Sequence, residues 1–246
     1  MQECVCLDPL DELYEGMAEV LIDQERPDCY KTYLLPAGGS VVLEESVALV
    51  SQGTTGLVTW EAALYLAEWA LDNQETFTSR SVLELGSGAG LTGMVVCGAC
   101  SPSSYTFTDF HPNVLQRLRA NLERNGLGEG GRVVSVEELD WGSVSEERLR
   151  EITADMVIAA DVVYDPTIIS GLVKLFSRIL RCGSPGGLPQ VLICSTVRNP
   201  DTYSGFKRQL EEAGLGYDVI SGGGRQVFLY NRASSIEIIQ LTLSTE

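Results

Sequence analysis

The sequence predicts an α/β protein built on a seven-stranded sheet, and three observations support this fold class. Short apolar runs alternate with stretches that show helical apolar spacing, which is typical of parallel strands joined by crossover helices. One apolar strand ends abruptly in alternating glycines at positions 86, 88 and 90, directly before a helical stretch. Too little chain joins the last two strand-like runs for a crossover helix, so we expect an antiparallel C-terminal pair.

A helix and a β-hairpin are predicted ahead of the sheet. Asp8 and the proline after it provide a cap and a first turn for residues that keep helical apolar spacing as far as Leu21. Residues 33–49 contain short apolar runs around the turn sequence Pro-Ala-Gly-Gly, which indicates a hairpin. We therefore expect an N-terminal appendage at residues 1–52 and the main domain at residues 53–246.

The elements of the main domain follow from apolar periodicity and from stop signals. A helix at 60–69 comes after the sequence Gly-Thr-Thr-Gly at 53–56, and a later helix is stopped by Asn125-Gly126. The predicted strands lie at 81–85, 105–109, 132–139, 155–160, 190–196, 217–220 and 236–243. The later helices are predicted at 91–100, 113–124, 168–180 and 206–213.

The charge of the chain limits its partners. The 246 residues carry a formal charge of −17, because 34 acidic side chains outnumber 17 basic ones. Such a charge repels phosphate backbones and anionic lipid, so we expect no direct contact with nucleic acid or membrane. The sequence shows neither a secretion signal nor an apolar run of bilayer length, and we expect a cytoplasmic protein. The oligomeric state is left open.

The cysteines do not predict a metal centre. There are seven of them, scattered mostly in apolar stretches, which favours reduced thiols in the core over a disulfide framework. Cys97 and Cys100 form one CxxC pair, but no second pair follows and His111 is the only histidine. We therefore expect no zinc site.

The glycine turn predicts a nucleoside pocket. It reads G-x-G-x-G after Glu84, whereas a dinucleotide fingerprint would place a third glycine at Leu91. Asp109 ends the next strand, where a carboxylate can accept hydrogen bonds from both hydroxyls of an adenosine ribose. The alternative is that Asp109 caps the helix that begins near Pro112. We read His111 as a pocket residue or a residue of the helix start, and not as a base.

Two features favour S-adenosylmethionine over a dinucleotide as the ligand. The first is the antiparallel pair expected at the end of the sheet. The second is Asp140-Trp141 after the third strand, which places a polar group and a flat indole where an adenine ring could rest. An ordinary core position for Trp141 is the alternative.

The fourth strand predicts where a second substrate would bind. Asp161 and Tyr164 follow the strand and emerge at the carboxyl edge of the sheet, where open α/β folds place their active sites. Ala159 and Ala160 are small enough for a close approach to the ligand. Asp161 could hold a cationic amine and Tyr164 could line its path. Capping of the following helix is the alternative for Asp161.

These motifs resemble those of a known family. The Gly-Thr-Thr-Gly segment with Trp60, the run 84–91, Asp140-Trp141 and the run 160–164 resemble, in order and spacing, the seven-strand class I protein-lysine methyltransferases of methyltransferase family 16. Residues 51–69, 82–92 and 196–200 are also similar to the members of this family that modify elongation factor 2. The similarity runs from about Pro9 to the C-terminus.

The resemblance implies a Rossmann-like fold, S-adenosylmethionine as the cofactor and a protein substrate, elongation factor 2. The implied catalytic residues are Asp161 and Tyr164. The candidate cofactor-binding residues are Trp60, Glu84, Gly86, Ser87, Gly88, Asp109, Trp141 and Ala160. The members that modify elongation factor 2 carry a helical extension ahead of the point where this sequence starts, so we expect substrate recruitment to depend on it.

Three other functions stay open at this stage. A small-molecule methyltransferase would use the same cofactor pocket, and a cofactor-binding scaffold would bind without turnover. A dehydrogenase is disfavoured by the glycine spacing and by the lack of an evident acid or base for hydride transfer.

Overall fold

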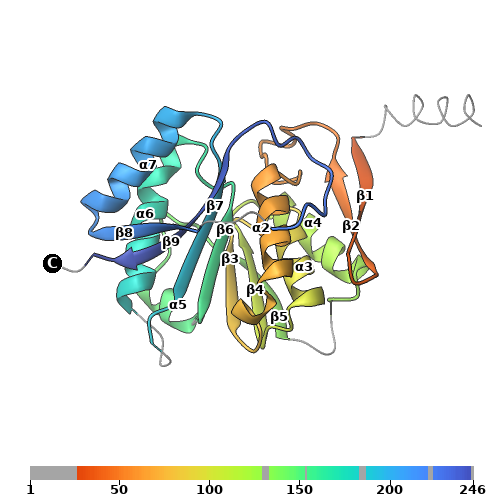
Figure 1. The fold of residues 1–246 in the computed structure, drawn as a ribbon, viewed down its shortest axis with the longest axis horizontal. Coiled ribbons are helices and arrows are strands. Elements are labelled where there is room, and N and C mark those ends of the chain that lie inside the picture. Colours follow the sequence, from red (N-terminus) through yellow and green to blue (C-terminus); the bar gives the residue numbers. More distant parts are fainter. Residues whose placement is uncertain (1–26, 129–132, 153, 183–186, 221–223, 245–246) are drawn as a thin grey trace, which may run out of the picture.

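The computed structural model describes residues 27–128, 133–152, 154–182, 187–220 and 224–244. A seven-stranded sheet in the order β5-β4-β3-β6-β7-β9-β8 forms its centre (Figure 1). Its strands are β3 (Ser81–Leu85), β4 (Ser104–Asp109), β5 (Val133–Glu138), β6 (Met156–Ala160), β7 (Gln190–Thr196), β8 (Leu215–Ile220) and β9 (Ile236–Leu243). The first five run parallel, whereas β9 is antiparallel to both β7 and β8. The predicted fold class and its antiparallel C-terminal pair are confirmed.

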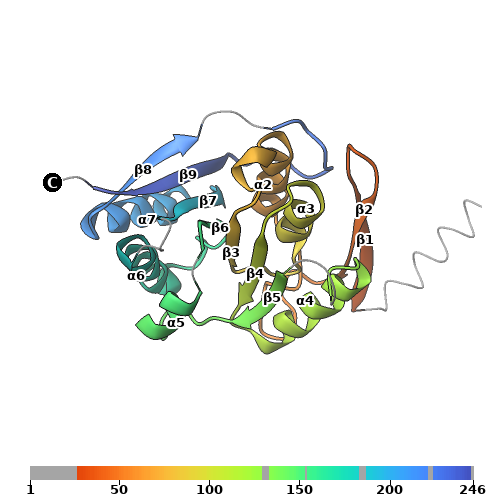
Figure 2. The same cartoon turned by 90° about the horizontal axis from the view of Figure 1, so that it is seen from below.

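Helices cover both faces of the sheet, as Figure 2 shows from below. The helices are α2 (Glu61–Asp72), α3 (Leu91–Ala99), α4 (Pro112–Arg124), α5 (Glu146–Glu151), α6 (Pro166–Cys182) and α7 (Pro200–Glu212). Because successive strand residues face opposite sides, Met156 and Ile158 of β6 join the core under α2, α3 and α4. Val157 and Ala159 join the core under α5, α6 and α7.

Helices α5 and α7 depart from the sequence prediction. The sequence analysis missed α5, which begins where Ser145 Oγ accepts a hydrogen bond from the Arg148 N–H at 3.1 Å. Helix α7 was predicted to begin at residue 206 but starts at Pro200, because the Asn199 side chain accepts from the Asp201 N–H at 3.0 Å. A side-chain cap followed by proline is a strong helix start, and it extends α7 beyond its apolar stripe.

The predicted hairpin is confirmed, but its strands end before residues 47–49. It consists of β1 (Asp28–Leu34) and β2 (Ser40–Ser46), which pair antiparallel. Asn125 of α4 holds it in place, since its Oδ1 accepts from the Val42 N–H at 2.8 Å. The helix predicted near residues 8–21 lies outside the described residues, and the boundary between residues 52 and 53 stays a prediction.

The chain changes direction across the sheet between β3 and β6. From β3 the connections lead outward to β4 and β5, whereas β6 and β7 lie on the other side of β3. A crevice forms at the carboxyl ends of strands at such a switch point. Among the described helices, none has the length and apolar character needed to span a membrane.

Candidate active site

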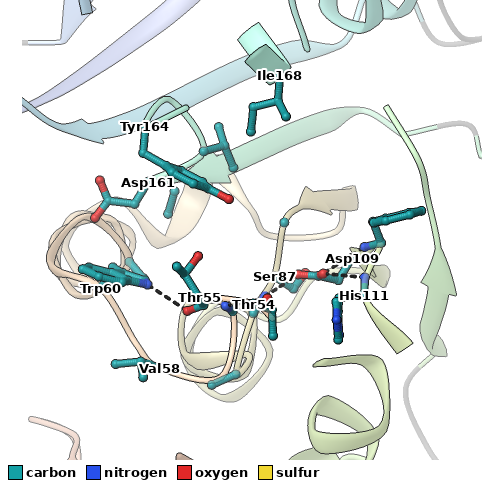
Figure 3. Close-up of a pocket in the computed structure, with 18 of the residues that line it drawn as sticks. Thr54, Thr55, Val58, Trp60, Ser87, Asp109, His111, Asp161, Tyr164 and Ile168 are labelled. Carbon is teal, nitrogen blue, oxygen red and sulfur yellow. Dashed lines mark hydrogen bonds between the residues drawn. The ribbon is translucent and has the colours of Figure 1, made fainter. Parts of the chain in front are cut away.

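A cavity of about 780 Å³ lies at this switch point. The ten residues predicted to bind the cofactor or to act in catalysis all line it, whereas Ala159 does not and packs instead in the core under α6. Figure 3 shows Trp60, Asp161 and Tyr164 on one side and Ser87, Asp109 and His111 on the other. The two sides come from different parts of the chain.

The glycine turn presents bare backbone to the cavity. Gly86 has φ +67° and Gly88 has φ +54°, values that side-chain-bearing residues rarely adopt. A Cβ at position 86 would lie 3.0 Å from Val162 and 3.3 Å from Trp141, and one at position 88 would lie 3.2 Å from the Gly56 carbonyl oxygen. The absence of side chains therefore keeps this wall of the cavity open.

Hydrogen bonds to the next strand fix the glycine turn. The Ser87 N–H donates to the Thr108 carbonyl at 2.8 Å, and the Thr108 N–H donates to Ser87 Oγ at 3.1 Å. Thr108 Oγ1 also donates to the carbonyl of Glu84 at 2.7 Å. The turn is thus held in shape by β4 without any ligand.

Asp109 gathers three backbone N–H groups at the end of β4. Its Oδ2 accepts from Gly88 at 3.2 Å, and its Oδ1 accepts from Phe110 at 2.8 Å and from His111 at 3.1 Å. Burial raises the pKa of Asp109 above its ordinary value, although these N–H groups oppose the shift. The N-cap of α4 is His111, whose Nδ1 accepts from the Asn113 N–H at 3.3 Å. Asp109 therefore does not cap α4, and the reading of His111 as a pocket and helix-start residue is confirmed.

Glu84 is a buried carboxyl with unsatisfied bonding capacity. Its side chain lies on the sheet face below the cavity and is 2% exposed. Its Oε2 and the Tyr105 hydroxyl are both buried and make no hydrogen bond of standard geometry among the described residues, although Tyr105 and Ser87 lie close enough to oppose the rise in the pKa of Glu84. Burial raises the pKa of Glu84 from 4.5 to about 8, so the free protein carries it largely protonated at neutral pH. A polar atom of this kind beside a cavity needs a polar partner.

Trp141 and Ala160 complete the wall between the two sides. Trp141 is half-buried, packs against the core under α6 and also lines the cavity, and its contact with an adenine ring stays a prediction. Ala160 ends β6 and pairs with Cys194 of β7. Its small side chain leaves the cavity continuous from the glycine turn to Asp161.

Asp161 holds the start of α2. Trp60 is the N-cap of this helix and makes no side-chain capping bond, and the Ala62 N–H donates instead to Asp161 Oδ2 at 3.1 Å. Asp161 also accepts from the Thr196 N–H at 2.9 Å and from Thr196 Oγ1 at 3.0 Å. Asp161 thus caps an earlier helix rather than the following one, where Asp165 accepts from the Thr167 N–H at 2.8 Å.

Tyr164 is free to meet a substrate. Its side chain is 55% exposed and its hydroxyl points into the cavity (Figure 3). Phe110, on the opposite side, is 59% exposed and also lines the cavity. The mouth of the site is therefore flanked by two exposed aromatic rings.

The sequence analysis assigned no role to Arg198, which also lines the cavity. Its Nη2 lies 3.0 Å from Asp161 Oδ2 and forms a second ion pair with Glu61. Its guanidinium carbon lies 4.8 Å from the ring centroid of Trp60. The only sequence signal was the similarity of residues 196–200 to relatives. Among the described residues, no cluster of three or more acidic, cysteine or histidine side chains could hold a metal ion.

Comparisons with known proteins agree on one family. Residues 45–212 match a family model described as lysine methyltransferase. The chain is 45% identical over 249 residues to the human protein-lysine N-methyltransferase EEF2KMT, covering 98% of this chain and 76% of that protein. It is 34% identical over 219 residues to the protein-lysine N-methyltransferase EFM3 of Chaetomium thermophilum, covering 80% and 63%.

Solved structures of similar fold are also methyltransferases. The precorrin-6y C5,15-methyltransferase of Geobacter metallireducens has a TM-score of 0.51 at 14% identity, over 81% of this chain and 92% of that chain. An O-methyltransferase family protein of Burkholderia thailandensis has a TM-score of 0.50 at 17% identity, over 75% and 58%. At these identities the likeness supports the fold alone.

Proposed function

The chain belongs to the lysine methyltransferase family and is thus a protein-lysine N-methyltransferase, and from this premise we propose that its methyl donor is S-adenosylmethionine and its substrate elongation factor 2. One observation carries the proposal. The sequence predicts one group of residues for a methyl-donor site and another for a methyl-acceptor site. These residues are spread along the chain from Trp60 to Tyr164, and they line one continuous cavity.

The donor side of the cavity fits S-adenosylmethionine. The bare backbone at Gly86 and Gly88 would allow a ligand to approach closely, and a Cβ at either position would crowd Val162, Trp141 or Gly56, which also line the cavity. Asp109 would accept hydrogen bonds from the ribose hydroxyls, and the half-buried indole of Trp141 would support the adenine. The unpartnered Oε2 of Glu84 offers an acceptor for the donor's amino group. Ser87 and Ala160 would line the rest of the donor side, and Trp60 would contact the cofactor from the opposite side of the cavity, where it lies with Asp161 and Tyr164.

The chemistry is a displacement at a methyl group. S-adenosylmethionine supplies an electrophilic sulfonium methyl when bound. A lysine amine has an ordinary pKa near 10.4, so it must lose its proton, to water in this proposal, before it can attack. Tyr164 would contact the amine and direct it toward the donor side, and alignment of this kind is the main source of acceleration.

Asp161 acts as a fixed negative charge in this proposal. A carboxylate oriented in advance would stabilise the positive charge that develops on the attacking lysine nitrogen. The carboxylate accepts bonds from Ala62, Thr196 and Arg198 and turns toward α2 (Figure 3), so it is not free to take a proton.

The substrate and the cellular location are also proposals. Relatives named EEF2KMT, together with the motif similarity, support elongation factor 2. The charge of −17 suits a basic surface, such as that of a factor that handles RNA. We propose a cytoplasmic location, which agrees with the predominance of buried thiols among the described cysteines.

The test is transfer of labelled methyl from S-adenosylmethionine to purified elongation factor 2, followed by mass spectrometry of its peptides. We expect one modified lysine, and we expect labelling to disappear when that lysine is replaced by arginine. Cofactor binding measured by calorimetry without any transfer would favour a scaffold. Transfer to small molecules alone would favour the other alternative.

A further inference from the structure

Arg198 lies on the acceptor side of the cavity, which is the side that carries Trp60, Asp161 and Tyr164. It belongs to the loop between β7 and α7, and its guanidinium reaches the residues before α2 and the end of β6. It pairs with Glu61 and with Asp161, which are 137 and 37 residues away along the chain, and it stacks on Trp60. No other described cation is recorded on either carboxylate.

Arg198 adds a positive charge between two carboxylates, of which Asp161 already accepts three other hydrogen bonds. The Asp161 side chain is 5% exposed and the Glu61 side chain is 30% exposed. Both lie at the start of α2, and a carboxylate as buried as Asp161 is costly without a charged or hydrogen-bonding partner. Asp161 also has φ +53°, a backbone conformation that residues other than glycine rarely keep unless their surroundings hold them.

Two of the residues that Arg198 contacts, Trp60 and Asp161, also line the cavity. Trp60 Nε1 donates to the Thr55 carbonyl at 3.1 Å, so the position of the indole sets that of a loop that lines the cavity (Figure 3). Asp161 begins the turn that presents Tyr164, three residues later. One guanidinium thus links the turn that carries Tyr164 to the wall that carries Trp60.

We infer that Arg198 is a positioning residue for the methyl transfer proposed above, on which this inference rests. By bridging Asp161 and Glu61 and covering Trp60, it fixes the turn of Tyr164 relative to the α2 start. The cation itself touches neither the methyl group nor the amine. Its loss changes turnover because the acceptor side loses alignment, while the glycine turn and Asp109 remain in place to bind the cofactor.

The experiment compares three variants of the full chain with the unaltered protein. Arg198→Met keeps the length and the apolar stem but removes the charge, Arg198→Lys keeps the charge, and Arg208→Met makes the same change at an exposed position of α7. Steady-state methylation of the protein substrate gives kcat and KM, and calorimetry gives the Kd for S-adenosylmethionine.

We expect Arg198→Met to lower kcat by about tenfold or more while the cofactor Kd changes by less than about threefold. Arg198→Lys should recover most of the lost kcat, and Arg208→Met should behave as the unaltered protein. A normal kcat in Arg198→Met overturns the inference. So does an equal loss in Arg198→Lys, or a loss of cofactor affinity that matches the loss of turnover.

Glu61→Gln provides a second route if Arg198→Met does not fold. Glu61→Gln and Arg198→Gln are milder changes that each remove one charge of the ion pair, and we expect their effects on kcat to be clearly non-additive in the double variant, because either change alone already breaks that pair. Additive effects overturn the inference. If the unaltered protein binds the cofactor but transfers no methyl group to any protein, the proposed function has failed instead.

Discussion

The two sides of the cavity are built in different ways. The donor side is made by the contiguous segment 84–90 and by Asp109 at the end of the adjoining strand, and backbone groups make most of its hydrogen bonds. The acceptor side is made by side chains, and its contacts join Ala62 to Asp161 across 99 residues and Glu61 to Arg198 across 137.

The two sides should therefore respond differently to substitution. A neighbouring strand fixes the donor side, so damage there should stay local and affect cofactor binding. The acceptor side depends on several loops at once, so damage should spread among Trp60, Asp161 and Tyr164 and affect turnover. Substitutions on each side therefore distinguish cofactor binding from turnover.

Glu84→Gln should remove a pH dependence of stability that belongs to the donor side. Above pH 4.5 the unfolded chain releases the Glu84 proton, whereas the folded protein keeps it up to about pH 8. Stability therefore falls as pH rises through this window, by on the order of 4 kcal/mol, and the loss is absent below it. The unfolding free energy of the variant, measured by denaturant titration, should be flatter over this range.

Glu138→Gln is the matched control for this change, because Glu138 is exposed at the end of β5. It should leave the pH dependence of unfolding unchanged. An identical pH slope in Glu84→Gln and the unaltered protein would show that Glu84 does not hold a proton in the folded state.

Asp109→Ala should abolish tight cofactor binding. The change removes the proposed acceptor of two ribose hydroxyl bonds and the anchor of the Gly88 N–H, a loss of about 3 kcal/mol or roughly a hundredfold in Kd. Calorimetry with S-adenosylmethionine measures it. The exposed Asp218→Ala on β8 is the control and should bind normally. Unchanged affinity in Asp109→Ala would show that Asp109 does not bind the ribose hydroxyls.

Gly86→Ala should lower the free energy of unfolding by about 2 kcal/mol, through strain at φ +67° and contact with Val162 and Trp141, and should weaken cofactor binding because the turn must shift to relieve them. Gly98→Ala in α3 is the control, because a Cβ there meets nothing within 4 Å and alanine favours a helix. Kd and thermal unfolding should be measured for both. Equal behaviour of the two variants would mean that bare backbone at position 86 is not required.

Tyr164→Phe should have the smallest effect, and only on turnover. The hydroxyl makes no hydrogen bond with the described residues and the side chain is exposed, so folding and cofactor affinity should not change. Losing one bond to the amine should lower kcat by roughly tenfold. A matching loss of cofactor affinity would show that Tyr164 contacts the cofactor, which would contradict its place on the acceptor side.

Local sequence patterns predicted most of the fold for a physical reason. Short apolar runs define the strands, and the glycines of the turn indicate its backbone conformation. The six-residue α5 was missed because it buries only Leu149, which leaves almost no apolar periodicity to detect. The early start of α7 was missed because a cap at Asn199, and not an apolar stripe, defines it.

By itself, the sequence determined the order of strands and helices, the bare turn at Gly86 and Gly88, and the position of Asp109 at a strand end, since each depends on neighbours along the chain. Only the tertiary structure decided that Asp161 caps α2 and that Arg198 joins it to Glu61. These contacts bring together residues from distant loops, and their energies depend on burial and on charges that meet only after the sheet has formed.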